Sequence, residues 1–420
     1  MQQAVQPVRQ KKRSISRNGM IAATMEGFPA IIVMLLLGGP YLTGFLLYLG
    51  ASSTQIGIVL AIPNLANVLQ ILSAILIQKF QNRKIGLLLF GGMHRIIWTS
   101  TGLIPFFVPH EWWVVVYIFV TMAAFASNAF GIVFYTSLMA DMVPAKVRGR
   151  YFGLRNSLIW ALGCVVLVIG GQILDRTPEP TGFHILYVIC AVCSVLNVLA
   201  FTRYPNLPFA PSEQQDMRRM IVQPFLHRPF LKATLFIALW LLLQGLSIPF
   251  YNYVMLDLMQ ISYSWISFIT MSQNVAMMAS YYVWGTLNMR FSTRTLLFWT
   301  MPLIATSSLL WGLTSVASAI PVLFLIHILL GIGTGGFNQL LFNFVVGDTP
   351  KSERPMFIAV FYGITGLAGF IGPVLGGLVY KHLAYTPAWV RTFGIAVTVG
   401  IVLVLIAALL GRRALRENQG

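Results

Sequence analysis

Long apolar runs alternate with short polar, glycine-rich or proline-rich segments along almost the whole chain of 420 residues. A helix needs about 20 apolar residues to cross a lipid bilayer. Stretches of this kind cover residues 20–48, 53–79, 84–108, 112–140, 148–174, 183–203, 229–257, 263–289, 293–316, 319–347, 353–380 and 388–411. The pattern therefore predicts an all-α membrane protein with twelve transmembrane helices.

A longer polar segment at residues 204–228, which contains several prolines and charges, interrupts this pattern near the middle of the chain. It predicts a cytoplasmic linker between two six-helix bundles, which cover residues 20–203 and 229–411. The polar residues 1–19 and 412–420 are predicted to be cytoplasmic tails.

The two predicted bundles share residues in the same order, which indicates an internal repeat. A shift of 206 residues aligns Pro144 with Pro350, Arg148 with Arg354 and Gly163 with Gly369, and a shift of 211 aligns Arg83 with Arg294. Parallel six-helix repeats are typical of transporters that bind their substrate near the membrane midplane. We therefore predict two pseudo-symmetric halves that rock about a site between them.

Composition favours the same class of protein, because 57% of the residues are hydrophobic and only 9% are charged, whereas soluble proteins carry about 25% charged residues.

Most of the 28 lysines and arginines fall in the predicted tails and in alternate loops on one side. Arg176, Lys381 and Arg391 fall on the other side, and Arg95 lies within a helix. This bias predicts that the basic side, with both termini, is cytoplasmic. No groove of basic and aromatic residues accompanies the net charge of +17, so we expect no nucleic-acid partner.

Residues 141–156 read D-M-V-P-A-K-V-R-G-R-Y-F-G-L-R-N, which matches the pattern D-x-V-P-x-x-x-R-G-R-x-F-G-x-R. On this segment, and on L-G-A-S at residues 49–52, the chain resembles bacterial members of the major facilitator superfamily over nearly its whole length. The resemblance implies the two-bundle fold of that superfamily, a bacterial cell membrane as location and a small-molecule substrate. We expect a monomer surrounded by lipid, with no cofactor.

The chain departs from this family pattern after the second helix. Where many members have an acidic residue, this sequence has Gln78, and the second half has Met289. Asp141 is predicted to supply a carboxylate on the same face instead, paired with Arg148 or Arg83. The predicted cytoplasmic gate consists of Asp141, Arg148, Arg83, Asp348 and Arg354.

Ionisable residues inside the predicted helices are few, and each is costly in a bilayer. Glu26 lies in the cytoplasmic third of the first helix. One interpretation is a proton acceptor that faces the cavity. The other is a carboxylate near the start of the helix, paired with Arg95 or Arg155.

His94 and Arg95 lie near the middle of the predicted helix 84–108. Adjacent helical residues point about 100° apart, so we expect only one of them to face the cavity. Arg95 does not lose its proton in proteins, and it is either an anion-binding or gating arginine or a structural partner of Glu26. Glu26 and His94 are the predicted proton-coupling residues.

Uncharged polar residues in several helices predict a polar cavity. Together with Arg95, the candidate substrate-cavity residues are Asn67, Gln70, Asn128, Tyr135, Gln244, Tyr251, Asn252, Asn274 and Asn338. Their amides and phenols suit a substrate with hydroxyl or amide groups. Each of them is equally suited to a hydrogen bond between helices.

These features together predict a secondary active transporter that moves a small organic molecule and is coupled to protons. The alternatives are a facilitative uniporter, a transport-inactive membrane sensor and a polytopic membrane enzyme. The chain has no H-E-x-x-H motif and no phosphate-binding loop followed by Lys-Ser/Thr, so we expect that it is not an enzyme.

Overall fold

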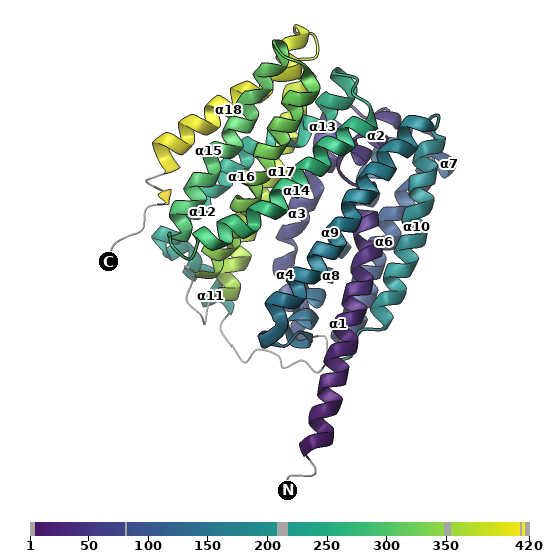
Figure 1. Ribbon diagram of the computed structural model, residues 1–420, viewed down its shortest axis with the longest axis vertical. Helices are drawn as coiled ribbons and strands as arrows, with labels where there is room; N and C mark the ends of the chain where they lie inside the picture. Colours follow the sequence, from purple (N-terminus) through teal and green to yellow (C-terminus); the bar gives the residue numbers. More distant parts are fainter. Residues whose placement is uncertain (1–4, 80–81, 208–216, 348–353, 412–413, 416–420) are drawn as a thin grey trace. The chain divides into compact units, whose positions relative to one another are not determined.

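The computed structural model describes residues 5–79, 82–207, 217–347, 354–411 and 414–415 (Figure 1). Within these residues the chain forms helices and turns and no β-strand. Contacts divide the chain into two compact units. The first unit consists of Met1–Phe45 and Leu69–Glu213, and the second consists of Leu46–Val68 and Gln214–Gly420.

The first unit is built from most of the helices before residue 207. Its α-helices are α1 (Val5–Leu36), α4 (Gln70–Lys79), α5 (Arg83–Gly86), α6 (Gly92–Ser100), α7 (Ile104–Phe107), α8 (Trp113–Met142), α9 (Ala145–Arg176) and α10 (Thr181–Thr202). A π-helical turn, η1 (Leu87–Gly91), joins α5 to α6. The helix α2 (Gly39–Tyr48) crosses the boundary between the two units.

The second unit contains the remaining helices and one from earlier in the chain. They are α3 (Ser53–Val68), α11 (Met217–Leu226), α12 (Arg228–Gly245), α13 (Tyr251–Tyr253), α14 (Tyr263–Leu287), α15 (Thr293–Leu309), α16 (Ala319–Gly347), α17 (Arg354–His382) and α18 (Ile395–Ile406). The helix α3 falls in this unit because it packs along α17 (Figure 1). The division into two six-helix bundles, which counts α3 with the first half by chain order, stays a prediction.

Within the described residues, nine helical segments are long and apolar enough to cross a membrane. They are Ser16–Leu36, His110–Met142, Arg150–Arg176, Thr181–Thr202, Arg228–Leu258, Thr293–Ser315, Ala319–Leu341, Phe357–His382 and Val390–Gly411. The other three predicted spans are helical as well, but 53–79 and 84–108 are each divided into shorter helices. The third, 263–289, forms α14, which is not among these nine segments.

Two helix boundaries differ from the sequence prediction. The helix α1 begins at Val5, so the predicted tail continues the first helix. The predicted helix 20–48 is broken after Leu36, where Gly39 adopts a left-handed backbone with φ of +52°. Glycine adopts this conformation without a steric penalty, and Pro40 directly after it disfavours helical backbone at residue 39.

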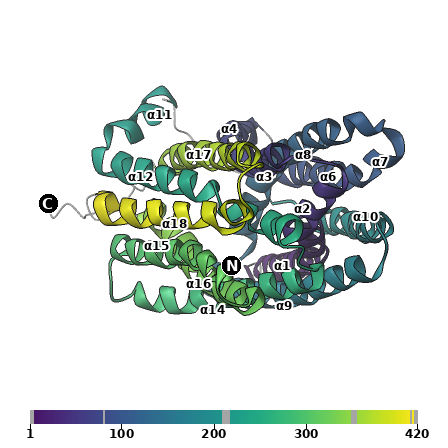
Figure 2. The ribbon, with the colours of Figure 1, turned by 90° about the horizontal axis from the view of Figure 1, so that it is seen from above.

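The same pairs of neighbouring helices recur in the two units. In the first unit α1 packs against α9 and α10, α6 packs against α8 and α10, and α4 packs against α8. In the second unit α12 packs against α17 and α18, α15 packs against α16 and α18, and α14 packs against α16 (Figure 2). Taken in chain order, each pair of the second set corresponds to a pair of the first set.

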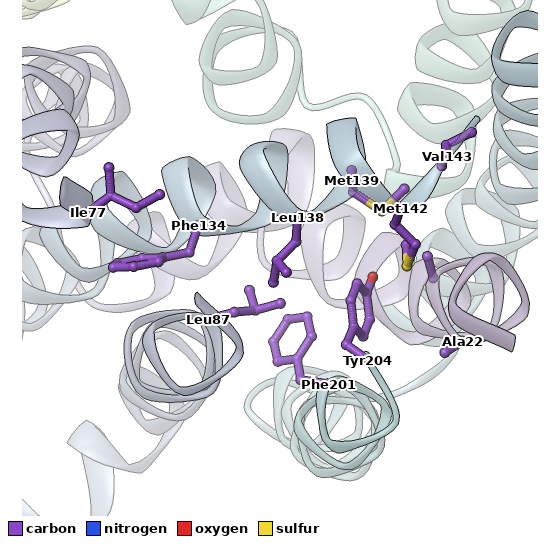
Figure 3. Close-up of a cluster of buried hydrophobic side chains, with 11 residues drawn as sticks. Ala22, Ile77, Leu87, Phe134, Leu138, Met139, Met142, Val143, Phe201 and Tyr204 are labelled. Carbon is purple, nitrogen blue, oxygen red and sulfur yellow. The ribbon is translucent and has the colours of Figure 1, made fainter. Parts of the chain in front are cut away.

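A cluster of buried apolar side chains lies between helices of the first unit (Figure 3). Leu138 on α8, Leu87 on η1 and Phe201 on α10 point toward one another, and Tyr204 lies beside them. The cluster consists of Ala22, Ala23, Ile77, Leu87, Phe134, Leu138, Met139, Met142, Val143, Phe201 and Tyr204. It joins α1, α4, α8 and α10, and through Tyr204 it reaches Glu26.

Glycines form the seam between α3 and α17 in the second unit. A Cβ atom added at Gly377 would lie 2.5 Å from the carbonyl oxygen of Ser53 and 2.8 Å from the Cα atom of Thr54. Asn64 donates a hydrogen bond of 3.0 Å to the carbonyl of Gly369. Close backbone contact of this kind is typical of helices that associate in membranes.

We expect Gly377→Ala to destabilise the protein, because the new methyl group meets backbone atoms that cannot move without separating the two helices. Overpacking of this kind costs about 1–3 kcal/mol. Thermal unfolding of the purified protein in detergent measures the effect. The matched control is Gly153→Ala on α9, where an added Cβ has no neighbour within 4 Å. Equal unfolding temperatures for the two variants would contradict the close seam.

Candidate functional site

Glu26 is the centre of a buried polar network in the first unit. Its side chain is 5% exposed. Asn197 on α10 donates hydrogen bonds of 2.9 Å to Oε1 of Glu26 and 3.0 Å to its backbone carbonyl. The Oε2 atom lies 3.5 Å from Nη2 of Arg155 and 3.5 Å from the hydroxyl of Tyr204. The carboxylate is therefore held by groups from three other parts of the chain.

Arg155 on α9 connects Glu26 to the neighbouring helices. Its Nε donates to the carbonyl oxygen of Ala23 on α1 at 3.0 Å, and its Nη2 donates to the hydroxyl of Tyr135 on α8 at 3.1 Å. Its Nη1 donates to Asn156 at 3.3 Å. Every nitrogen of this guanidinium thus has an acceptor.

Arg95 and His94 point in different directions, as expected for adjacent helical residues. Nε of Arg95 donates to Oδ1 of Asn197 at 3.2 Å, and Glu26 is close enough to attract it electrostatically. The ring of His94 is 3% exposed, makes a 2.9 Å hydrogen bond to the carbonyl of Ala124 on α8, and stacks on Trp98. Arg95 therefore belongs to the Glu26 network, whereas His94 is turned toward α8.

Asn197 is the member of this network that sequence reasoning missed. Its side chain is fully buried, and it uses its amide oxygen for Arg95 and its amide nitrogen for Glu26. It is the single amide residue of α10, a largely apolar helix. An isolated amide in such a helix is the signal that could have found it, because a polar group in a membrane needs a partner.

The predicted gate residues Asp141 and Arg83 form an ion pair at the end of α8. Oδ2 of Asp141 lies 2.7 Å from Nη2 of Arg83. Arg83 is 1% exposed and also donates to the hydroxyl of Ser137 at 2.7 Å and to its carbonyl at 3.1 Å. Asp141 is 56% exposed. Of the two partners considered for Asp141, the structure brings Arg83 to it.

The rest of the predicted gate cannot be placed. Asp348 lies outside the described residues, as do the side chains of Arg148 and Arg354. In the second unit Arg294, which the repeat aligns with Arg83, is buried with its guanidinium 5.4 Å from the centre of the Phe344 ring.

The predicted cavity residues are divided between the two units. Tyr135 belongs to the Glu26 network, and Asn128 lies two helical turns from it on α8. Asn67 lies in the α3–α17 seam, near Gly366. Tyr251 is buried and hydrogen-bonded to Ser308 at 2.9 Å. Among the remaining ones, Gln70, Gln244, Asn252 and Asn274 are half-buried on α4, α12, α13 and α14, and Asn338 is exposed on α16.

These features define a multi-pass membrane protein with a charged network inside a helical unit. Residues 33–391 match the model of the MFS_1 like family. The chain therefore belongs to this family, and its membership of the major facilitator superfamily is confirmed. No curated protein matches it in sequence.

Solved structures of transporters share its fold. A D-xylose-proton symporter matches with a TM-score of 0.70 and 12% identity, over 94% of this chain and 97% of that one. The nucleoside transporter NupG matches with a TM-score of 0.68 and 14% identity, over 96% and 100%. A bacterial homologue of the iron transporter ferroportin, in an inward-facing state, matches with a TM-score of 0.69 and 14% identity, over 96% and 99%. At these identities the likeness concerns the fold.

We expect Asn197→Leu to destabilise the protein by about 2 kcal/mol or more, because it leaves charged groups of Glu26 and Arg95 without their buried partner. Thermal or denaturant unfolding in detergent measures the change. The matched control is Asn338→Leu on the exposed face of α16, for which we expect less than about 0.5 kcal/mol. Similar losses for both variants would show that Asn197 does not hold the network.

Mutations of Arg83 and of Asp141, the two partners of the ion pair, are expected to destabilise the protein unequally. Asp141→Asn should cost less than about 1 kcal/mol, because Asp141 is exposed and solvent screens the pair. Arg83→Met should cost more than about 2 kcal/mol, because the buried hydrogen bonds to Ser137 are lost as well. Unfolding measurements on both variants test this order, and a larger loss for Asp141→Asn would reverse it.

Proposed function

We propose that the chain is a secondary active transporter that moves a small organic molecule across a bacterial cell membrane by alternating access, coupled to protons. The observation that carries the proposal is the buried network around Glu26. Charges inside membrane helices are costly and mark functional pathways, and a buried ion pair adds little stability. Membership of a transporter family supports the same function.

Glu26 is the proposed proton carrier. Protonation removes its negative charge, which weakens its attraction to both guanidiniums and exchanges a hydrogen-bond acceptor for a donor. The ionisable groups close to its carboxylate are Arg155, Arg95, Tyr135, Tyr151 and Tyr204. Binding of one proton thus alters contacts to α6, α9 and α10 together, and this offers a link between protonation and helix movement.

We also propose the predicted architecture of twelve helices in two six-helix halves. The aligned residues and the recurring helix pairs support an internal repeat. The excess of lysine and arginine on one side supports a cytoplasmic location for both termini. A monomer is the proposed functional form.

The ion pair of Arg83 and Asp141 is proposed as a cytoplasmic gate. It joins the start of α5 to the end of α8, and it sits at the charged end predicted to face the cytoplasm. One partner is buried and the other is exposed, so the pair is open to solvent on one side. Such a contact can break and re-form during transport.

Flux measurements test proton coupling. Ligands that raise the unfolding temperature of the purified protein are first selected from a library of small organic molecules. Each is then followed in proteoliposomes with and without a pH gradient. We expect accumulation that depends on the gradient. A confirmed substrate whose flux is indifferent to the gradient would favour a uniporter.

The variant Glu26→Gln distinguishes loss of proton coupling from loss of substrate binding. This variant should lose accumulation driven by the pH gradient but retain exchange of labelled for unlabelled substrate, because the amide keeps hydrogen-bonding capacity without titrating. The matched control is Glu111→Gln, an exposed carboxylate before α8, which should transport like the natural protein. Full gradient-driven accumulation by Glu26→Gln would remove Glu26 from the proton pathway.

A further inference from the structure

Arg95 has more hydrogen-bonding capacity than the described protein uses. A guanidinium has five N–H donors and keeps its charge in proteins. Among the described residues, the one hydrogen bond of this guanidinium runs from Nε to Asn197. The side chain lies on a predicted membrane helix and is only partly covered. Its Nη1 and Nη2 edge is therefore free to bind a ligand.

Arg155 differs from Arg95 in this respect. Each of its nitrogens donates to an acceptor on α1, α8 or α9. It is also the arginine that forms the ion pair with Glu26. Arg155 thus supplies the structural partner of the carboxylate, and Arg95 is left as the arginine that can take an external anion.

The net charge of the network also favours an anionic ligand. Two guanidiniums, of Arg95 and Arg155, face the single carboxylate of Glu26. The neighbouring tyrosines are phenols, which ionise only near pH 10. The network therefore carries one positive charge in excess while Glu26 is ionised. An unbalanced charge at this depth is costly, and an anionic ligand removes the cost.

We propose that Arg95 binds the carboxylate of a small organic monoanion, and that this anion is the transported substrate, which rests on the proposed function. A guanidinium matches a carboxylate with two parallel hydrogen bonds, and Arg95 has both terminal nitrogens available. While Glu26 is ionised, one excess charge is balanced by one negative charge. A doubly charged phosphate ester would then leave a negative charge in its place.

Glu26 and the bound anion compete for the same positive charges. When Glu26 is ionised, its carboxylate reduces the attraction that Arg95 exerts on the ligand. When Glu26 is protonated, the network gains positive charge and holds the anion more tightly. Proton and anion therefore bind cooperatively, which is the requirement for their joint transport.

Binding of matched acids and amides tests the inference on the purified protein. The probes are benzoate, nicotinate and hexanoate, each compared with its primary amide at constant ionic strength. We expect the acids, and not the amides, to raise the unfolding temperature. Calorimetric titration then gives the affinity for the best acid, and phenyl phosphate tests the preference for a monoanion.

Three variants test whether the acids bind at Arg95. Arg95→Gln should weaken binding of the acid by about tenfold or more, as expected for loss of a charge-assisted hydrogen bond. Glu26→Gln should strengthen it, because the competing carboxylate is gone. Arg203→Gln, which removes an exposed arginine after α10, should leave binding unchanged and controls for net charge.

The inference is overturned if no acid stabilises the natural protein, if the amides or phenyl phosphate stabilise it equally, or if Arg95→Gln binds the acid as tightly. If the Arg95→Gln variant does not fold, the comparison of acids with amides and the affinity of the Glu26→Gln variant still test the inference. These experiments measure binding and not transport. If the protein binds acids through Arg95 but transports none of them, the proposed function is contradicted and the anion-binding site is still supported.

Discussion

A charged group inside a membrane must find its counter-charge and its hydrogen bonds within the protein, and the first unit is arranged around this constraint. Glu26 on α1 reaches Arg155 on α9 and Asn197 on α10, and Asn197 in turn holds Arg95 on α6. Each contact crosses between helices. The network therefore fixes how these helices face one another, in addition to any chemistry it performs.

The helices themselves could be predicted because lipid imposes a strong pattern: long apolar stretches with polar breaks. The network could be predicted only in part, since the pattern does not say which way a side chain points. Glu26 and Arg95 stood out by their charge, whereas Asn197 is one amide in an apolar helix and its two partners lie 171 and 102 residues away. The partner of Asp141 was likewise left open between Arg148 and Arg83, because packing of α5 against α8 decides it.

The proposed repeat extends to the helix pairs but not to the Glu26 network. The helix pairs of the first unit recur in the second. At a shift of 206 residues, however, Arg155 aligns with Phe361 and Asn197 aligns with Leu403. Both of these counterparts are apolar and buried. The proposed repeat thus has the same helix pairs in both halves, while among the described residues the Glu26 network lies in the first unit.

The excess of one guanidinium in the Glu26 network would expose the proposed transport cycle to the membrane potential. Because a proton and a monoanion bind together, the network carries one positive charge when it is empty and one when it is loaded, so the potential would act on both forms alike. Carrying one elementary charge across the full potential changes the free energy by about 2.3 kcal/mol for every 100 mV. A potential that is negative inside would draw the site toward the cytoplasm in both forms. The electrical energy of the membrane would then cancel over a complete cycle, and the gradients of protons and substrate would set the direction of net transport.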